Sequence, residues 1–301
     1  MRVWPFRRKA GTAGKADTDN SRRRLFGREY TAGVPYALPS DLSEMNRLDF
    51  QHFILRQAFK GNYAAPVRSP ARILDVGTGT GRWAMEMATH FPAAQVVGLD
   101  IKEQMAESQG GASAAANMRP ANYSFVSGNI LEGLPFPDVS FDYVHQRLLF
   151  FAIPSDRWQF VLGELARVTR PGGWVEVVEG RYGYEPMGPA AQAISDVMLG
   201  AMQKRGIDPR ASEHLDQFLR NAGLRHVETR TIKLPVGDWG GRLGQLAVTD
   251  VMTFSQAAKP LLLAQGMTEG ECAALTEEMR RECETMRYTW PFYIVYGQRP
   301  G

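Results

Sequence analysis

A carboxylate set inside an apolar run and followed at once by glycines is the most chemically suggestive feature of this sequence. It lies in the stretch ARILDVGTGTGRWA, where an acid precedes three glycines at alternate positions. Glycine tolerates positive φ and lets a ligand approach the backbone closely. A helix that starts after such a loop points its unpaired N–H groups at the same place. The residues that we expect to contact a ligand there are Asp75, Gly77, Thr78, Gly79 and Gly81.

A second carboxylate, Asp100, follows nineteen residues after Gly81, at the end of the apolar segment QVVGLD. In an open parallel sheet, ligands bind beyond the carboxyl ends of the strands, and an acid at the end of the second strand can accept hydrogen bonds from ribose hydroxyls. The loop and this acid together indicate a ligand that contains adenosine.

Two adenosine ligands are compatible with this pattern, and Asp75 discriminates between them. A nicotinamide dinucleotide would place its pyrophosphate anion over the loop, where a carboxylate repels it. S-adenosylmethionine carries a sulfonium and an ammonium cation, and a carboxylate attracts both. The spacing G-x-G-x-G also differs from the dinucleotide pattern G-x-G-x-x-G. We therefore expect S-adenosylmethionine, and the pattern disfavours a nicotinamide-dependent oxidoreductase.

The elements that would hold these residues alternate between strand and helix. Such alternation predicts right-handed crossovers and a doubly wound, mostly parallel sheet of the α/β class. A loop with Pro66 and Pro70 precedes the first strand. The expected strands are 73–76, 95–100, 123–130, 140–146 and 174–180, and the expected helices are 82–90, 102–117 and 155–170.

The flanking parts of the chain follow a different pattern. Asp41 and Glu44 form a potential capping box for a helix before the first strand, and Thr268 and Glu271 form another near the end. Two strands, separated by a long helical stretch, end the sequence and predict an edge hairpin. These strands are 226–235 and 290–300, and the helices expected in this half are 189–206, 210–222, 241–264 and 268–287.

The ordered segments ILDVGTGTG, VVGLD, GNILEGLPFPDVSFDYVH and VTRPGGWVEVVE resemble the class I S-adenosylmethionine-dependent methyltransferases, over about residues 70–180 and again at the terminal strand. The preceding segment REYTAGVPYALPSDLSEMNRLDFQH is similar to the branch that contains the fungal LaeA-like regulators of secondary metabolism and their bacterial relatives. The resemblance implies a Rossmann-like sheet of seven strands, the last antiparallel, with helices on both faces.

The resemblance also implies cofactor contacts, with one departure from the family pattern. The family commonly has Asp where this chain has Asn129, although an amide oxygen can still accept a hydrogen bond from the adenine amino group. The implied roles are the methionine end for Asp75 and the loop 77–81, the ribose for Asp100, the adenine face for Ile101, and the adenine edge for Asn129 and Ile130.

The acceptor side lacks a strong signature. Alignment of the reactants can lower a barrier by roughly 7–11 kcal/mol, and a base adds about 10²–10⁴-fold, so a catalytic base is not required. The segment HQRLLFF lacks the Asp/Asn-Pro-Pro-aromatic motif expected for methylation of nucleobase amino groups. The candidate catalytic residues are His145, Glu179 and Tyr36, and the further candidates are Tyr182, Arg47, His52, Trp239, Met252 and Phe254.

Each candidate also has a purely structural interpretation. His145 can be a hydrogen-bonded structural histidine or a cofactor contact, and Glu179 can serve only to accept backbone N–H groups. Arg47 and His52 can be ordinary helix residues. The apolar stretch around Phe254 can roof an acceptor pocket or pack in the core. The sequence leaves these alternatives open.

Charge and composition divide the chain into three parts. Residues 1–26 hold eight basic and two acidic residues, whereas the remainder holds 27 basic and 30 acidic ones. We expect 1–26 to be a disordered basic tail, which weak contact with nucleic acid or an anionic surface would suit. We expect 27–69 to be a helical cap and 70–301 to be the methyltransferase domain. The helical insertions of that domain are expected at about 185–223 and 239–287.

No apolar run approaches the roughly 20 residues of a membrane helix. SRRRLFG resembles a twin-arginine export signal, but no apolar segment follows it. Cys272 and Cys283 are expected in one helix, about 16 Å apart, too far for a disulfide. We expect a cytoplasmic protein that needs no metal.

The sequence thus predicts an S-adenosylmethionine-dependent methyltransferase acting on a small, partly apolar molecule. The alternative is a methyltransferase-like scaffold that binds the cofactor and regulates through partners. The acceptor, the methylated atom and the oligomeric state are not assigned by the sequence.

Overall fold

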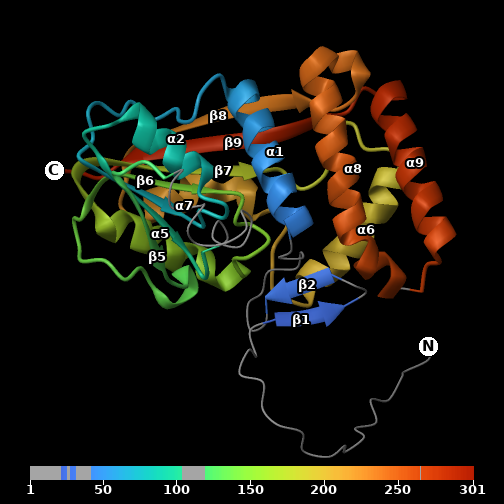
Figure 1. Cartoon of the computed structure of the whole chain (residues 1–301), viewed down its shortest axis with the longest axis horizontal. Helices are drawn as coiled ribbons and strands as arrows, with labels where there is room; N and C mark the ends of the chain where they lie inside the picture. The colour runs from blue at the N-terminus through green and yellow to red at the C-terminus, as the bar shows by residue number, and fades with distance from the viewer. Residues whose placement is uncertain (1–21, 26–27, 32–41, 104–118, 265) are drawn as a thin grey trace, which may run out of the picture.

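The apolar run that begins at Ile73 forms the central strand β3 (Arg72–Val76) of a seven-stranded sheet (Figure 1). Ile73, Leu74 and Val76 have no exposed surface. Strands of a parallel sheet are covered on both faces, so their apolar residues run on without alternation. This is the reason that the acid within β3, Asp75, stands out.

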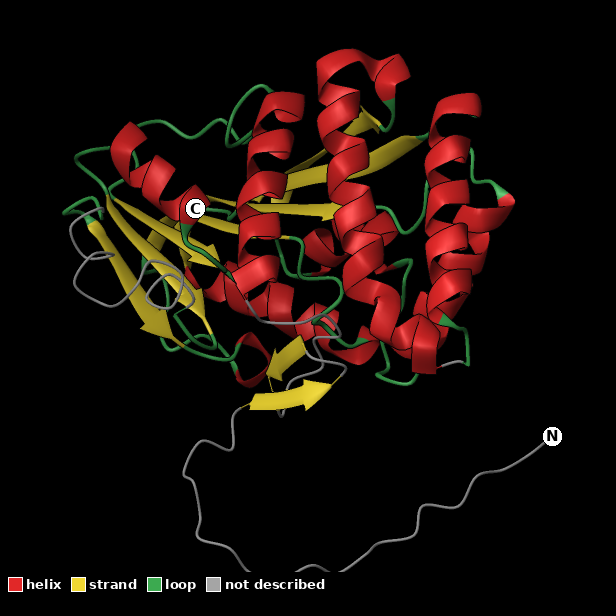
Figure 2. Ribbon diagram, turned by 45° about the vertical axis from the view of Figure 1, so that its right-hand side comes forward, coloured by secondary structure: helices red, strands yellow, loops and turns green. Residues whose placement is uncertain are grey.

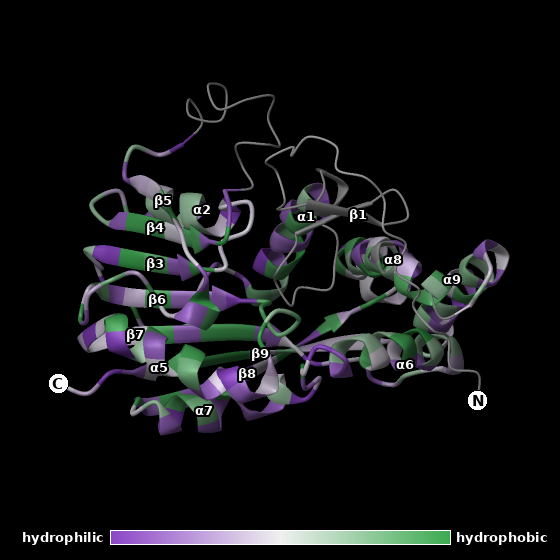
Figure 3. Ribbon diagram, turned by 90° about the horizontal axis from the view of Figure 1, so that it is seen from below, coloured by the Kyte–Doolittle hydropathy of each residue, from purple (hydrophilic) through white to green (hydrophobic). Residues whose placement is uncertain are grey.

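A computed structural model describes residues 22–25, 28–31, 42–103, 119–264 and 266–301. In these residues the sheet order is β5-β4-β3-β6-β7-β9-β8, which Figure 3 shows from top to bottom. All pairs are parallel except the two that β9 makes with β7 and β8. The expected doubly wound sheet with an antiparallel last strand is confirmed. The other strands are β4 (Gln95–Asp100), β5 (Tyr123–Ser127), β6 (Phe141–Arg147), β7 (Thr169–Gly180), β8 (Arg225–Pro235) and β9 (Thr289–Gln298).

Helices cover both faces of the sheet (Figure 2). The helix α2 (Arg82–His90) packs on one face with Trp83 and Met87 buried. The helices α5 (Trp158–Val168) and α7 (Leu215–Asn221) pack on the other face, where Trp158 has no exposed surface. Among the described residues, the short 3₁₀ turns that join the elements are η1 (Ile130–Glu132), η2 (Ser155–Arg157), η3 (Ala211–His214) and η4 (Asp238–Gly240).

Four longer helices stand beyond the carboxyl ends of the parallel strands (Figures 1 and 3). They form a second apolar cluster that includes Ile54, Ala191, Val251 and Met279. Thr268 and Glu271 make the predicted capping box, because each side chain binds the other's backbone N–H. These helices, called the cap below, are α1 (Leu42–Phe59), α6 (Pro189–Gln203), α8 (Gly241–Ala264) and α9 (Glu269–Thr285).

Several expected boundaries are wrong. The expected helix 155–170 begins as a 3₁₀ turn and ends at Val168, because Thr169 already pairs with Phe141 in the sheet. The fifth strand therefore starts five residues before the predicted position. The expected strand 123–130 ends at Ser127, because Asn129 begins the turn η1.

The amino-terminal segment also differs from the expectation. Within the tail 1–26 that we expected to be disordered, Arg22–Leu25 form the strand β1, which pairs with β2 (Arg28–Thr31). Residues 1–21, Asp41 of the expected first capping box, Tyr36 and most of the expected helix 102–117 lie outside the described residues. No helix in the described ranges is long and apolar enough to cross a membrane.

Candidate functional site

The glycine loop turns sharply between β3 and α2. Its glycines Gly77, Gly79 and Gly81 have φ values of 68°, 55° and 76°, which strain residues with a side chain. A Cβ at Gly77 would lie 2.5 Å from a carbon of Leu149, and one at Gly81 would lie 2.9 Å from the hydroxyl oxygen of Tyr123. Glycine is therefore required at these two positions for steric as well as conformational reasons.

Asp75 is buried beneath this loop, with 3% of its surface exposed. The Thr78 hydroxyl donates to Asp75 Oδ2 over 2.6 Å, and His145 Nδ1 lies 2.8 Å from Asp75 Oδ1. The sheet explains the second contact, because Asp75 and His145 are paired neighbours on β3 and β6. Both carboxylate oxygens are thus fixed in place.

The surroundings of His145 favour its structural interpretation over that of a catalytic base. Its ring is 1% exposed and stacks on Trp83 with centroids 3.8 Å apart. It does not line the cavity described below. The structure gives His145 the role of holding Asp75, because the sheet register directs the ring sideways to its neighbour.

Asp100 connects the end of β4 to the glycine loop. Its carboxylate accepts hydrogen bonds from the N–H groups of Gly79, over 2.8 Å, and Ile101, over 2.7 Å. Burial raises the pKa of Asp100, and these two hydrogen bonds oppose that rise. Ile101 is 40% exposed despite its apolar side chain. A carboxylate beside an exposed apolar side chain suits a ribose with an adenine ring.

Asn129 and Ile130 lie at the end of the next strand, β5. Asn129 caps the turn η1, accepting from the Leu131 N–H at 3.1 Å and donating to Glu132 at 2.9 Å. Ile130 is partly buried against the core. The Gly128 N–H donates to the Asp100 carbonyl, so these residues adjoin Asp100. The structure brings the predicted cofactor residues together at the ends of β3, β4 and β5.

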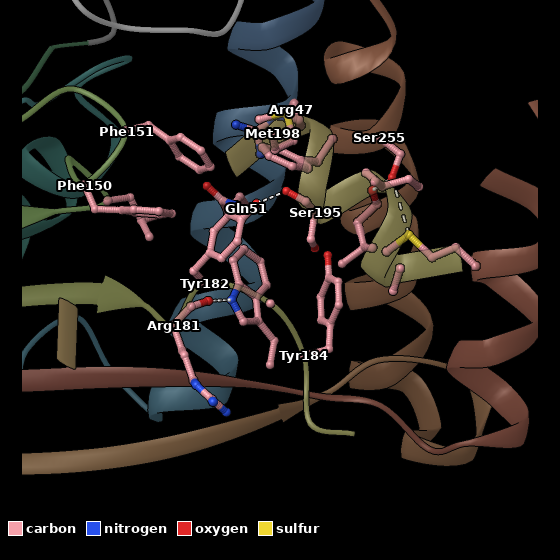
Figure 4. A pocket seen from close by; sticks show the side chains of 18 of the residues that line it. Arg47, Gln51, Phe150, Phe151, Arg181, Tyr182, Tyr184, Ser195, Met198 and Ser255 are labelled. Atoms are coloured by element: carbon pink, nitrogen blue, oxygen red, sulfur yellow. Dashed lines mark hydrogen bonds between the residues drawn. The ribbon is translucent and has the colours of Figure 1, made fainter. Parts of the chain in front are cut away.

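A separate cavity opens between the cap and the carboxyl ends of the strands (Figure 4). Most of its wall is apolar or aromatic. The described lining residues include no carboxylate and no imidazole. They are Arg47, Leu48, Gln51, Leu148, Phe150, Phe151, Arg181, Tyr182, Gly183, Tyr184, Ala191, Ile194, Ser195, Met198, Val251, Phe254, Ser255, Met279 and Trp290.

A buried polar contact joins the helices α1 and α8 at the cavity wall. Arg47 Nη1 lies 3.3 Å from Asp250 Oδ1, and Gln51 donates from Nε2 to Asp250 Oδ2 over 3.0 Å. The Arg47 guanidinium also lies 5.9 Å from the centre of the Phe254 ring. Because this ion pair is shielded from water, breaking it would leave a buried charge without a partner. The pair therefore fixes α1 against α8 at the cavity wall.

The segment after β6 separates the cavity from the glycine loop. Leu149 contacts Gly77 on one side, whereas Leu148 and Phe150 line the cavity on the other. The Glu179 carboxylate accepts hydrogen bonds from the N–H groups of Leu149, over 2.9 Å, and Phe150, over 3.4 Å. One buried acid, Glu179, therefore holds the segment that lies between the cavity and the glycine loop.

The surroundings of Glu179 also favour its structural interpretation. It has no exposed surface and does not line the cavity. Its carboxylate is directed to the N–H groups of Leu149 and Phe150 instead. Acceptance of backbone N–H groups is one of the two roles that the sequence leaves open for Glu179, and these hydrogen bonds support it.

Helix α1 contacts the glycine loop as well as the cavity. Asp49 accepts from the Thr80 hydroxyl at 2.5 Å and from Arg82 at 2.8 Å. On the same helix, Arg47 and Gln51 line the cavity. One rigid element thus adjoins both sites.

Glu179 gives a pH-dependent prediction. Burial raises its pKa to about 8 from an ordinary value of 4.5. Between these values the native state keeps a proton that the unfolded state releases, so stability falls as the pH rises through the window. Urea unfolding of the wild type and of Glu179→Gln, at pH values near 4.5 and above 8, should show the variant gaining stability relative to the wild type at the higher pH. An equal difference at both pH values would contradict this prediction.

His52, another candidate, lies between two charged groups and away from the cavity. Arg147 donates to its Nδ1 over 2.8 Å, and its Nε2 lies 3.2 Å from Glu86. Burial, followed by the charge of Arg147, lowers the pKa of His52 to about 4. His52 is therefore neutral near pH 7 and joins α1 to the sheet and to α2.

The apolar stretch around Phe254 is only partly in the cavity wall. Phe254 lines it, whereas Met252 packs in the cap cluster and Trp239 is 38% exposed and donates to the Val236 carbonyl. Arg47 and Tyr182 do line the cavity. Gln51, Tyr184, Ser195 and Met198 also line the cavity and are not among the residues predicted from the sequence. Gln51, Ser195 and Met198 have only their helical spacing as a signal, which does not separate cavity residues from core residues, and Tyr184 lies in a loop between β7 and α6.

Comparison with known proteins extends these observations. A family model described as a methyltransferase domain matches residues 73–173. The chain is 28% identical over 274 residues to the N-methyltransferase tcpN of Claviceps purpurea, covering 85% of this chain and 94% of that one. It is 30% identical over 235 residues to the methyltransferase str3 of Strobilurus tenacellus, covering 75% of this chain and 80% of that one.

Solved structures share the fold. Phosphoethanolamine N-methyltransferase 2 of Haemonchus contortus, in complex with S-adenosyl-L-methionine, superposes with a TM-score of 0.52 at 17% identity. Its complex with phosphomonomethylethanolamine and S-adenosylhomocysteine gives 0.54 at 16% identity. Each match covers 91% of this chain, which spans 62% of that protein's length. In the described part of the chain, no cluster of three or more His, Cys, Asp or Glu side chains could hold a metal ion.

Proposed function

Because the chain belongs to the class I S-adenosylmethionine-dependent methyltransferases, we propose that it methylates a small, partly apolar molecule bound in the cavity beneath the cap. The enzyme class and the cofactor, S-adenosylmethionine, follow from the family. The observation that carries the acceptor proposal is a largely apolar cavity whose wall residues Leu148 and Phe150 flank Leu149, which contacts Gly77 of the glycine loop.

The residues around the glycine loop fit this cofactor. When bound, S-adenosylmethionine supplies a methyl group that is activated by the adjacent sulfonium. We propose that Asp75 and the loop residues Gly77, Thr78, Gly79 and Gly81 bind its methionine end. Asp100 would accept hydrogen bonds from the ribose hydroxyls in place of its present bonds to backbone N–H groups. Ile101, Asn129 and Ile130 would contact the adenine.

The chemistry assigned to the chain is alignment. None of the described cavity residues carries a carboxylate or an imidazole, so the described wall offers neither group as a base. This favours an acceptor atom that is nucleophilic in its neutral form, such as a nitrogen with a lone pair. The name of tcpN, an N-methyltransferase, agrees with such an acceptor. Holding the two reactants in line can contribute roughly 7–11 kcal/mol.

The rival function, a scaffold that regulates through partners, has less support. A scaffold does not need an apolar cavity next to its cofactor site. The resemblance of the amino-terminal segment to LaeA-like regulators therefore stays a proposal about ancestry. We likewise propose the division into a tail, the amino-terminal cap segment 27–69 and a catalytic domain. Helix α1 of that segment supports the division, because it contacts both the glycine loop and the cavity.

Filling the cavity tests the acceptor proposal. Ile194 lies in the wall on α6 and is 5% exposed. Ile194→Trp should lower the yield of methylated product by about tenfold or more, because even small misplacement of an acceptor is costly. The affinity for S-adenosylmethionine should stay unchanged. Product is measured by mass spectrometry over a panel of apolar amines and phenols, and the affinity by calorimetry.

The matched control is Val139→Trp, at a side chain that is 48% exposed and not in the wall. It should leave both quantities at the wild-type level. Undiminished product formation by Ile194→Trp, with the variant folded, would mean that acceptors bind elsewhere.

A further inference from the structure

Several hydroxyl groups lie in the largely apolar wall of the cavity, and most of them already donate hydrogen bonds within the protein. The Tyr182 hydroxyl donates to the Ser195 carbonyl, and the Ser255 hydroxyl donates to the Val251 carbonyl over 3.1 Å. The Ser195 hydroxyl points to the sulfur of Met187 at 3.7 Å. These groups have little capacity left to donate a hydrogen bond to a bound molecule.

Tyr184 differs from Tyr182, two residues earlier on the same segment. Its ring stacks on Tyr288 with centroids 5.5 Å apart and meets Trp290 edge-on at 6.2 Å. Its hydroxyl, which Figure 4 shows directed into the cavity, makes no hydrogen bond to any described residue. Tyr184 is partly buried, and a hydroxyl that no described side chain engages, on a ring held by two aromatic neighbours, is free to donate to a molecule in the cavity.

Gln51 presents a second polar group to the same cavity. Asp250 as a carboxylate can only accept, and it binds Gln51 Nε2. The amide oxygen of Gln51 must then point away from Asp250, and Gln51 lines the cavity. The wall therefore carries the Gln51 amide and the Tyr184 hydroxyl among its aromatic rings.

We propose that Tyr184 is the specificity-determining residue for the acceptor, and that it donates a hydrogen bond to a neutral heteroatom of a flat, otherwise apolar molecule. This inference rests on the proposed function, since it assumes that the acceptor occupies the cavity. The two arginines of the wall are paired, Arg47 with Asp250 and Arg181 with Glu185. A neutral ligand thus matches the wall better than a charged one, which would need a counter-charge.

The test compares two probes of nearly equal shape, quinoline and naphthalene, of which only quinoline has a nitrogen that accepts a hydrogen bond. Binding is measured near neutral pH, with S-adenosylhomocysteine present so that no transfer occurs. A neutral hydrogen bond contributes about 0.5–1.5 kcal/mol, so the wild type should prefer quinoline roughly 2–13-fold. Tyr184→Phe should abolish this preference and leave naphthalene binding unchanged.

Tyr182→Phe is the matched control, because that hydroxyl is already used by Ser195. It should keep the preference for quinoline. Tyr184→Phe retains the ring that packs on Tyr288 and Trp290, and its melting temperature shows whether the fold is kept. Should it unfold, the carbonyl stretch of 2-acetylnaphthalene bound to the wild type provides the second readout, since a hydrogen bond from Tyr184 lowers its frequency.

A wild type without the preference, a Tyr184→Phe variant that retains it, or an unshifted carbonyl stretch would overturn the inference. The proposed function fails by a different result. If no acceptor is methylated although Tyr184→Phe abolishes the preference, the recognition role stands and the acceptor proposal falls.

Discussion

Replacing Asp75 by alanine is expected to weaken S-adenosylmethionine binding roughly 10–150-fold. The variant removes the charge-assisted contact that we propose to the cationic methionine end, which is worth about 1.5–3 kcal/mol. The carboxylate is already fixed by Thr78 and His145, so it is in place before the cofactor arrives. Such preorganisation makes its loss larger than that of a surface carboxylate.

Calorimetry with S-adenosylmethionine, S-adenosylhomocysteine and NAD measures this effect. NAD should not bind the wild type, since Asp75 would face its pyrophosphate. Asp75→Asn, which keeps an oxygen for the Thr78 hydroxyl, separates the loss of charge from the loss of packing and should weaken binding nearly as much. Asp216→Ala on α7, where the side chain is 41% exposed, serves as the control. Undiminished cofactor affinity in Asp75→Ala would refute the assignment.

Replacing Glu282 by alanine is expected to destabilise the cap by about 2–5 kcal/mol. Glu282 is 6% exposed, and its carboxylate accepts from the N–H groups of Ala190, over 2.8 Å, and Ala191, over 3.0 Å. It also accepts from the Tyr288 hydroxyl over 2.7 Å. The variant leaves these buried donors without a partner and removes a negative charge from the amino terminus of α6.

Urea unfolding measures the stability, and the affinity of the cavity for naphthalene reports on α6, which supplies several wall residues. Glu278→Ala, one turn earlier on α9, provides the comparison, because that side chain is 51% exposed and pairs only with Arg281 among the described residues. It should change stability by less than about 0.5 kcal/mol. Equal effects of the two substitutions would show that Glu282 does not hold α6.

The cofactor half of the site could be predicted from the sequence because its signals are local. The required positive φ at Gly77 and Gly81 selects glycine directly, and the loop must follow the strand that precedes it. Asp100 ends the next strand, and parallel pairing brings the ends of adjacent strands together. In the structure the Gly79 N–H donates a hydrogen bond to the Asp100 carboxylate. The two residues are 21 positions apart in the sequence.

The acceptor half could not be predicted with the same accuracy. A helical repeat places Ile194 and Met198 on one face, yet a face turned to the core and a face turned to a cavity have the same apolar spacing. His145 and Glu179 carry chemistry that resembles catalysis. In the folded chain, His145 is hydrogen-bonded to Asp75. Glu179 accepts hydrogen bonds from the N–H groups of Leu149 and Phe150.

The sequence by itself determined the alternation of strands and helices from β3 to β7, the glycine loop and the acids that face it, because each depends on residues close together in the chain. The tertiary structure alone decided which side chains line the cavity. Tyr182 and Tyr184 are identical in type and two residues apart, and only the packing of α6, α9 and β9 around them leaves the second hydroxyl facing the cavity. Hydrogen-bond partners contributed by distant segments have no local signal, so the role of such a group follows only from the folded chain.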